Sequence, residues 1–173
     1  MANPTMTLIG SPITVGSGGA SNLTFTSIPA TYTDLILKFS LRYGDYSSWN
    51  YAYIQLNSTA GAIKTISGNG SGSSAGSSNI TTSLRIDFVP GTGQTSNTFS
   101  NAELYIPNYT TSNAKSVSLD YVSESNATTA YSELGAGLFS TVTSAVTSIS
   151  LLVDGSWNFA QYSTAYLYGV SNS

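Results

Sequence analysis

Carboxylates are the side chains with the most chemical potential in this sequence, because it contains no histidine and no cysteine. That composition excludes a histidine general base, a Ser-His-Asp or Cys-His pair, a zinc site built on imidazole or thiolate, and a disulfide framework. A glycosidase needs two acids about 5 to 10 Å apart. Two sets could converge in this way: Asp120 with Glu124 and Glu133, or Asp34 with Asp45. Eight acids in a strand-rich chain give such pairs by chance, so we expect that the protein is not an enzyme.

Two oxygen-rich loops, residues 45–50 and 120–126, are of the kind that accepts a hard cation such as calcium. Neither loop has the ligand spacing of a defined calcium site, and a hydrated turn is the simpler interpretation. The sequence therefore predicts neither a cofactor nor a catalytic metal.

Aromatic residues form the second chemically useful group. Five of them fall between residues 43 and 53, and in the expected strand 49–56 the rings occupy one face while Ala52, Ile54 and Leu56 occupy the other. A ring face that is free of the core would stack on a sugar or on a neighbouring subunit, whereas rings buried on both sides would fill the interior. The candidates for glycan or subunit contact are Tyr46, Trp49, Tyr51 and Tyr53.

Strands must position these side chains, because the periodic segments alternate apolar and polar residues with period two. The clearest segment is 35–43, in which Leu35, Leu37 and Phe39 share a face and Lys38, Ser40 and Arg42 point the other way. The same alternation marks residues 84–88, 102–106 and 117–121. Weaker strands are expected near residues 5–9, 22–28, 50–57, 62–67, 128–134, 146–153 and 158–169.

This spacing of strands and turns predicts an all-β protein, an antiparallel jelly-roll-like sandwich of about 8–10 strands. The loops are uneven in length and no internal repeat is visible, which favours a sandwich over a propeller. Residues 21–173 form a single domain in this interpretation. The Gly/Ser-rich segment 68–79 is expected to be a flexible surface loop, because its side chains bury almost nothing.

Residues 1–20 are expected to form an N-terminal arm, with a Gly-rich hinge at Gly16, Gly18 and Gly19. Such an arm adds an edge strand either to its own sheet or to that of a neighbour, and the sequence leaves both open. Its apolar side chains, Met6, Leu8, Ile9 and Ile13, are candidates for contact with a partner protein.

Charge and hydropathy exclude several classes of partner. The five basic residues are spread singly and the pI is about 4.5, so nucleic acid is not an expected partner. No run of about 18 apolar residues and no basic leader are visible, so we expect neither membrane insertion nor a signal peptide. Ser and Thr make up about 30% of the chain, far above ordinary usage.

Three segments resemble a β-rich module of structural proteins from tailed bacteriophages, especially those that infect cyanobacteria and other aquatic bacteria. They are FTSIPATYTDLILKFSLR (25–42), YIQLN (53–57) and WNFAQYSTAYLYGV (157–170). Their most specific motifs are Ile-Pro before a Tyr-Thr-Asp-Leu strand and a final Leu-Tyr-Gly-Val.

The resemblance implies a virion component that is assembled in the host cytoplasm. It is either a capsid decoration (cement) protein or the distal part of a tail fibre. We expect the decoration role, since no shaft or attachment domain is recognisable. The major capsid protein and a homotrimer of this chain are then the expected partners, with Met6, Leu8, Ile9 and Ile13 at the shell. The alternative is a tail-fibre or adhesin module that binds a host-surface glycan through the ring cluster.

Overall fold

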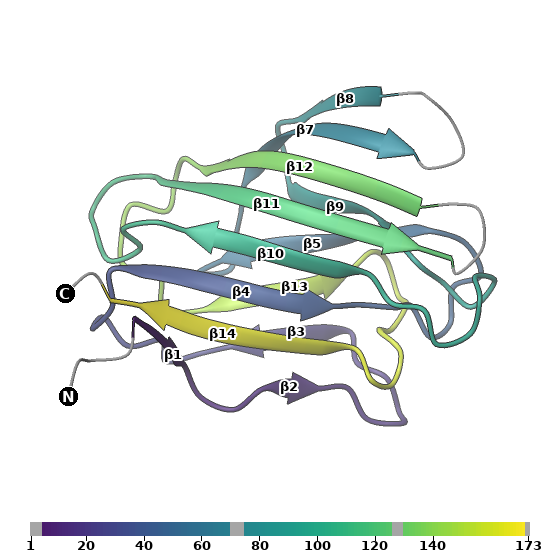
Figure 1. Cartoon of the computed structure of the whole chain (residues 1–173). Coiled ribbons are helices and arrows are strands. Elements are labelled where there is room, and N and C mark those ends of the chain that lie inside the picture. The colour runs from purple at the N-terminus through teal and green to yellow at the C-terminus, as the bar shows by residue number, and fades with distance from the viewer. Residues whose placement is uncertain (1–4, 70–74, 126–129, 172–173) are drawn as a thin grey trace.

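Antiparallel strands make up the regular structure in the computed structural model, which describes residues 5–69, 75–125 and 130–171. In these residues there are fourteen strands and no helix. They pack as two layers, a nine-stranded sheet in front of a five-stranded sheet in the view of Figure 1. The antiparallel sandwich predicted from the alternation is confirmed. The strand order does not establish the jelly-roll connectivity.

The nine-stranded sheet, called here the large sheet, contains both ends of the described chain. Its order is β1 (Met6–Leu8), β14 (Thr164–Val170), β4 (Asp34–Ser40), β10 (Asn101–Ile106), β11 (Lys115–Glu124), β12 (Ala130–Phe139), β7 (Ala62–Asn69) and β8 (Ala75–Ile80), and β2 (Ile13–Thr14) also pairs with β14. The small sheet runs β3 (Asn22–Phe25), β13 (Ile149–Val153), β5 (Asn50–Leu56) and β6 (Thr59–Ala60), and β9 (Leu84–Val89) also pairs with β5.

The core lies between the facing sides of the two sheets. On β4, Leu35, Leu37 and Phe39 are at most 2% exposed, as the alternation predicted. On β5, Ala52 and Ile54 meet them from the small sheet with at most 1% exposure. Each fully buried side chain of this size contributes about 1.5 to 3 kcal/mol relative to an exposed one. The core side of the central strands could therefore be predicted from period two alone.

Arg42 was expected on the solvent-exposed face of its strand, but its side chain is buried. It is 8% exposed, because the chain between β9 and β10 folds over it. Its guanidinium donates hydrogen bonds of 2.9 Å to the carbonyls of Thr95 and Thr98 and one of 3.0 Å to that of Gln94. Burial lowers the pKa of this guanidinium. The residue fastens a loop, and alternation carries no signal of such a long-range contact.

Phe88 also breaks the expected alternation. The pairing of β9 with β5 shifts register between Asn50 and Ala52, which marks a β-bulge. Phe88 adopts a positive φ of 62°, and Val89 takes the core position with 0% exposure. The ring of Phe88 instead stacks on Tyr131 of β12, with a centroid distance of 4.1 Å.

The segment predicted as a loop at 68–79 is largely strand. β7 continues to Asn69 and β8 begins at Ala75, while residues 70–74 lie outside the described residues. The pairing of Ser67 with Gly76 and of Ile66 with Ser77 shows why, since backbone hydrogen bonds order a chain whose side chains bury little. The strand expected at 128–134 likewise runs on to Phe139, and residues 126–129 are not described.

The segments 25–42 and 157–170 contact each other directly. A Cβ built on Gly169 of β14 would lie 2.2 Å from Cγ of Tyr32, so this ring packs flat on the glycine. The backbone N–H of Tyr32 donates to the hydroxyl of Tyr109 at 3.4 Å, and that hydroxyl donates to the carbonyl of Pro29. These motif residues therefore have a packing role at the junction of β4 and β14.

Candidate functional site

The carboxylates considered for catalysis do not converge. Asp120 of β11 is exposed on the outer face of the large sheet, whereas Glu133 of β12 is 2% exposed and points into the interior beside Tyr121. Glu124 shares the face of Asp120, since the two are an even number of residues apart on one strand. The sheet thus separates Glu133 from both other acids.

Asp34 and Asp45 lie at opposite ends of β4, and both have structural partners. The carboxylate of Asp34 accepts hydrogen bonds of 2.8 Å from the hydroxyl of Tyr105 and from the backbone N–H of Asn108. The carboxylate of Asp45 accepts bonds of 2.8 and 3.0 Å from the backbone N–H and side-chain amide of Asn158. The described part of the chain contains no group of three acidic side chains placed to hold a metal.

Glu133 is the most perturbed acid, and it links the two sheets. Its carboxylate accepts a hydrogen bond of 3.2 Å from the backbone N–H of Asp87 on β9. Burial raises the pKa of the Glu133 carboxyl to about 7, helped by the Asp87 carboxylate and opposed by Arg85 and by hydrogen bonds from the Asp87 N–H and Thr65. Asp87 itself pairs with Arg85 at 2.6 Å. The group is enclosed, so its effect is on stability rather than on a substrate.

The ring cluster predicted at residues 46–53 is largely occupied by contacts within the chain. Tyr46 packs against Trp157 with a centroid distance of 5.2 Å, and Trp49 meets Tyr131 edge-on at 4.9 Å. The hydroxyl of Tyr53 donates to Asp154 at 3.0 Å. These three rings are therefore engaged by other parts of the sandwich.

Tyr51 is the ring of this group that remains exposed, at 38%. The guanidinium of Arg85 lies 3.9 Å from the centre of its ring, which is a cation–π contact. This contact covers one face of the ring, so only the other face is open to a ligand. A platform of several free rings is not formed.

The arm residues divide between two environments. β1 and β2 pair with β14, so the arm adds its strands to its own sheet in this structure. Met6 and Leu8 are 39% and 40% exposed, and their pairing with Val170 and Tyr168 places them on the outer face of the large sheet. Ile9 and Ile13 instead pack against the core and are partly buried, so less of either is free for a partner.

The outer face of the large sheet collects most of the exposed apolar side chains. Of the nine large apolar or aromatic side chains that are exposed in the described residues, six lie on this face. The strand pairing runs from Leu8 through Tyr168, Ile36 and Tyr105 to Ser118 and Ala136, so both ends of the sheet share one continuous surface. Besides Met6 and Leu8, which the sequence had already singled out, there are Ile66, Val122, Leu134 and Leu138, and we call these four the outer-face patch.

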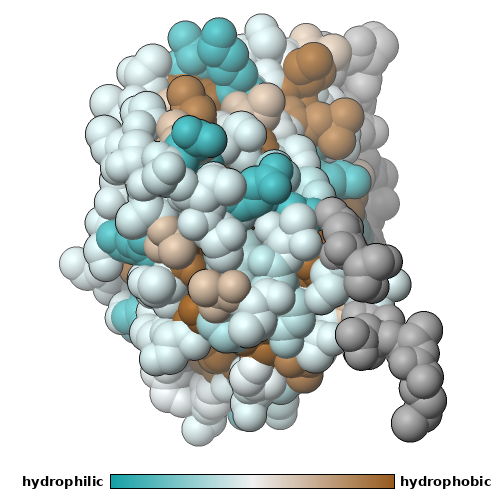
Figure 2. All heavy atoms as spheres, turned by 90° about the vertical axis from the view of Figure 1, so that its left-hand side faces the viewer, coloured by the Kyte–Doolittle hydropathy of each residue, from teal (hydrophilic) through white to brown (hydrophobic). Residues whose placement is uncertain are grey.

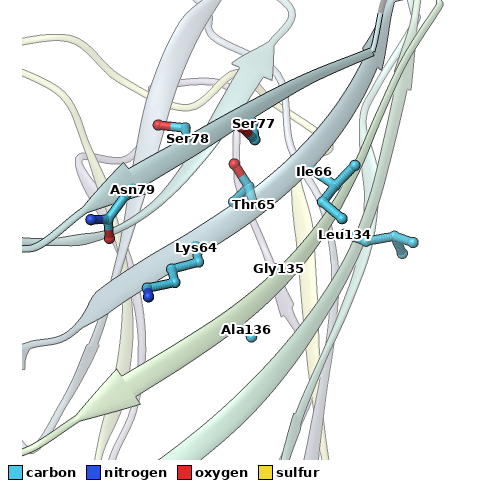
Figure 3. A pocket seen from close by; sticks show the side chains of 9 residues that line it. All are labelled: Lys64, Thr65, Ile66, Ser77, Ser78, Asn79, Leu134, Gly135 and Ala136. Carbon is cyan, nitrogen blue, oxygen red and sulfur yellow. The ribbon is translucent and has the colours of Figure 1, made fainter.

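A shallow hollow of about 710 Å³ crosses β12, β7 and β8 beside this patch. Ile66 and Leu134 lie next to each other at one end, and Lys64 and Asn79 lie at the other (Figure 3). Thr65 lies between these rows, and its side chain is buried at 4% exposure. The hollow is therefore a trough between two rows of outward side chains, with one apolar end and one polar end.

The end of the sandwich that faces the viewer in Figure 2 is mostly weakly polar, with its hydrophilic residues in separate spots. This agrees with charges that are spread singly along the sequence. Within the described residues there is no helix long and apolar enough to cross a membrane.

Comparison with known proteins gives no relative for this chain. No family model, no curated protein and no solved structure matches it. The candidate site is therefore argued from geometry, and the surface that the geometry singles out is the outer face of the large sheet.

The outer-face patch was missed in the sequence. On β12, Leu134 and Leu138 alternate with Gly135 and Gly137, a pattern that by hydropathy alone would turn the leucines inward. The glycines face inward instead, because a Cβ on Gly137 would lie 2.5 Å from Leu84, and one on Gly135 would lie 2.7 Å from the Ile63 side chain. A sequence signal for this orientation is Phe139, which lies an even number of residues from both glycines, so it shares their inward face, and it is fully buried.

Proposed function

We propose that this protein is a virion structural protein of a tailed bacteriophage, assembled in the host cytoplasm. In its most specific form, it is a decoration protein that binds the major capsid protein on the outside of the head and stabilises the shell as a homotrimer. The observation that supports this function is the outer face of the large sheet. Six of the nine large apolar or aromatic side chains exposed in the described residues gather on this one face, and such a gathering is typical of a binding surface.

The chemistry of this face suits attachment to a large, repeated protein surface. Its apolar side chains stand among small residues such as Ser132 and Ala136, and its charges are of both signs, with Lys38 paired to Glu103 at 2.8 Å and with Lys64, Asp120 and Glu124 also exposed. The charges are of mixed sign and the apolar side chains cost little to desolvate, so this face does not require a partner of one strong charge. Many copies on a symmetric shell would then bind through avidity. The resemblance to phage structural modules supports the same role.

Substitution of the outer-face patch tests the proposal. We expect Ile66→Ser with Leu134→Ser to weaken binding to heads that lack the protein by at least tenfold. Burial of one such side chain is worth about 1.5 to 3 kcal/mol and a factor of ten corresponds to about 1.4 kcal/mol. Co-sedimentation with heads of the encoding phage measures the affinity. Met6→Ser with Leu8→Ser tests the arm without removing the core contacts of Ile9 and Ile13.

Tyr51→Ser is the matched control, because Tyr51 is exposed on the small sheet at the opposite face of the sandwich. A decoration protein should retain head binding in this variant. If Tyr51→Ser abolished adsorption to host cells, while the Ile66 and Leu134 variant bound heads normally, the glycan-binding alternative would replace the proposal. The number of copies per virion, measured by mass spectrometry against the major capsid protein, separates head from tail independently.

A further inference from the structure

The arm is attached to the domain mainly through the backbone of one strand. The N–H groups of Ile9 and Val15 donate to the carbonyls of Leu167 and Ser163 at 2.8 and 2.9 Å. The N–H of Tyr162 donates back to the carbonyl of Val15 at 2.9 Å. These bonds depend on backbone groups of β14 and the residues just before it. The same groups on a second copy of the chain would accept the same arm with the same geometry.

The other side of the arm is separated from the small sheet by a groove. A hollow of about 440 Å³ lies between residues 8–13 and the edge of the small sheet around residues 24–29. Figure 1 shows β1 and β2 along the lower edge of the large sheet, with β3 behind them. In the described part of the arm, Val15 belongs to the core, and Ile9, Ile13 and Ala20 pack against it. The arm is therefore a strip at the edge of the sandwich, held by backbone bonds to β14 and by a few apolar side chains at the margin of the core.

The segment that joins the arm to the domain contains glycines that the local structure does not require. Gly16 and Gly18 lack the positive φ that favours glycine, and a Cβ on either would meet nothing within 4 Å. Gly19 is different, since it has a φ of 72° and lies against Asn158. A glycine that neither conformation nor space requires adds chain entropy and weakens the attachment. Gly16 and Gly18 thus suit a hinge.

We propose that the arm exchanges between copies of this chain, so that β1 and β2 of one copy pair with β14 of the next. The four residues 16–19 span up to about 14 Å when extended, which lets the arm leave its own β14 while the domain stays folded. Exchange needs no new complementary surface, because the receiving edge of β14 is the one that the arm already occupies within its own chain. Arm exchange deepens the proposed function, because it specifies how the copies are joined. It rests on the proposed function only in that both require an oligomer.

A disulfide across the arm tests the exchange, and the chain has no cysteine of its own to interfere. Thr14 lies opposite Thr164. The next pair along the strands, Val15 and Ser163, is hydrogen-bonded, so Thr14 and Thr164 form a non-hydrogen-bonded pair. The Cα atoms of such a pair are about 4.5 Å apart. This spacing suits a disulfide. The Thr14→Cys, Thr164→Cys variant is purified, oxidised and run on a denaturing gel without reductant, with its mass in solution measured by light scattering.

Exchange predicts that most of the oxidised protein runs as covalently linked multimers, up to the size of the native oligomer. An oligomer whose disulfides all lie within single chains would overturn the exchange and leave the decoration proposal standing. A monomer with the same internal disulfide would overturn both the exchange and the homotrimer. Met6→Cys with Val170→Cys repeats the test at the other end of the arm, should the first pair fail to oxidise.

The control variant is Thr24→Cys with Ser150→Cys, a pair on β3 and β13 whose hydroxyls are 3.0 Å apart. Neither strand belongs to the arm, so this variant should give monomeric bands whether or not arms exchange. In the test variant, adding Gly16→Ala and Gly18→Ala should lower the linked fraction at least twofold by stiffening the hinge. An unchanged fraction would contradict the role of these glycines.

Discussion

Replacing Glu133 by Gln should raise the free energy of unfolding at pH 8 by up to about 3 kcal/mol and leave it nearly unchanged near pH 4.5. Burial raises the pKa of this carboxyl from 4.5 to about 7 in the folded protein. The folded state therefore binds the proton more tightly than the unfolded state. The contribution of the protonated group to stability is complete below pH 4.5 and is lost as the pH rises through 7. A Gln is neutral at every pH and keeps an oxygen to accept the Asp87 N–H.

Urea unfolding followed by tryptophan fluorescence at pH 4.5, 6 and 8 measures the effect as the difference between variant and native protein. The groups that face Glu133, namely Asp87, Arg85 and Thr65, are present in both, so their own contributions largely cancel. Glu103→Gln is the control, because Glu103 pairs with Lys38 on the exposed outer face and should give no such gain. A difference between Glu133→Gln and the native protein that did not change with pH would contradict the buried-acid interpretation.

Gly169→Ala should destabilise the protein by about 1 to 3 kcal/mol, the usual cost of overpacking. The new methyl group would need the space occupied by the ring of Tyr32 at 2.2 Å. The backbone N–H of Tyr32 is held by the hydroxyl of Tyr109, and Cγ lies close to that backbone, so the near end of the ring has little freedom to move aside. The cost should appear in the urea midpoint with an unchanged slope.

Tyr32→Ala provides the second half of the test. If the clash with the ring is the cause, the double variant should be more stable than the sum of the two single losses predicts. Additive losses would show that Gly169 is required for another reason. Gly18→Ala serves as the matched glycine control, since no atom lies within 4 Å of the position that its new methyl group would take, and a gain of up to about 1 kcal/mol is expected.

Strand positions and the core side of the central strands followed from the sequence, because period-two alternation is a local property. Leu35, Leu37 and Phe39 were assigned inward on that basis and are buried. The residues whose burial was predicted wrongly share one cause, because contacts with distant parts of the chain determine where their side chains lie. Phe88 leaves the core at a bulge set by its partner strand, and Arg42 is covered by a loop about fifty residues away in the chain.

The candidate surface was harder to predict than the fold. The aromatic residues between 46 and 53 attract attention in a sequence, yet Tyr46, Trp49 and Tyr53 are engaged within the chain. The outer-face patch comes mainly from β7, β11 and β12, and it becomes visible only when their register is known. Hydropathy marks Leu134 as apolar, but it carries no information about which face of the sheet that residue occupies.

The position of β14 between the arm and β4 has a consequence for synthesis. Met6 pairs with Val170, and Leu37 of β4 pairs with Leu167, so two strands made early both wait for one made more than a hundred residues later. Contacts of this sequence separation close slowly, because the loop entropy is lost before the contact forms. During translation, the edge of β4 and the arm remain unpaired until residues 164–170 leave the ribosome. Arms from neighbouring nascent chains can meet in that interval, when each still lacks its own partner strand.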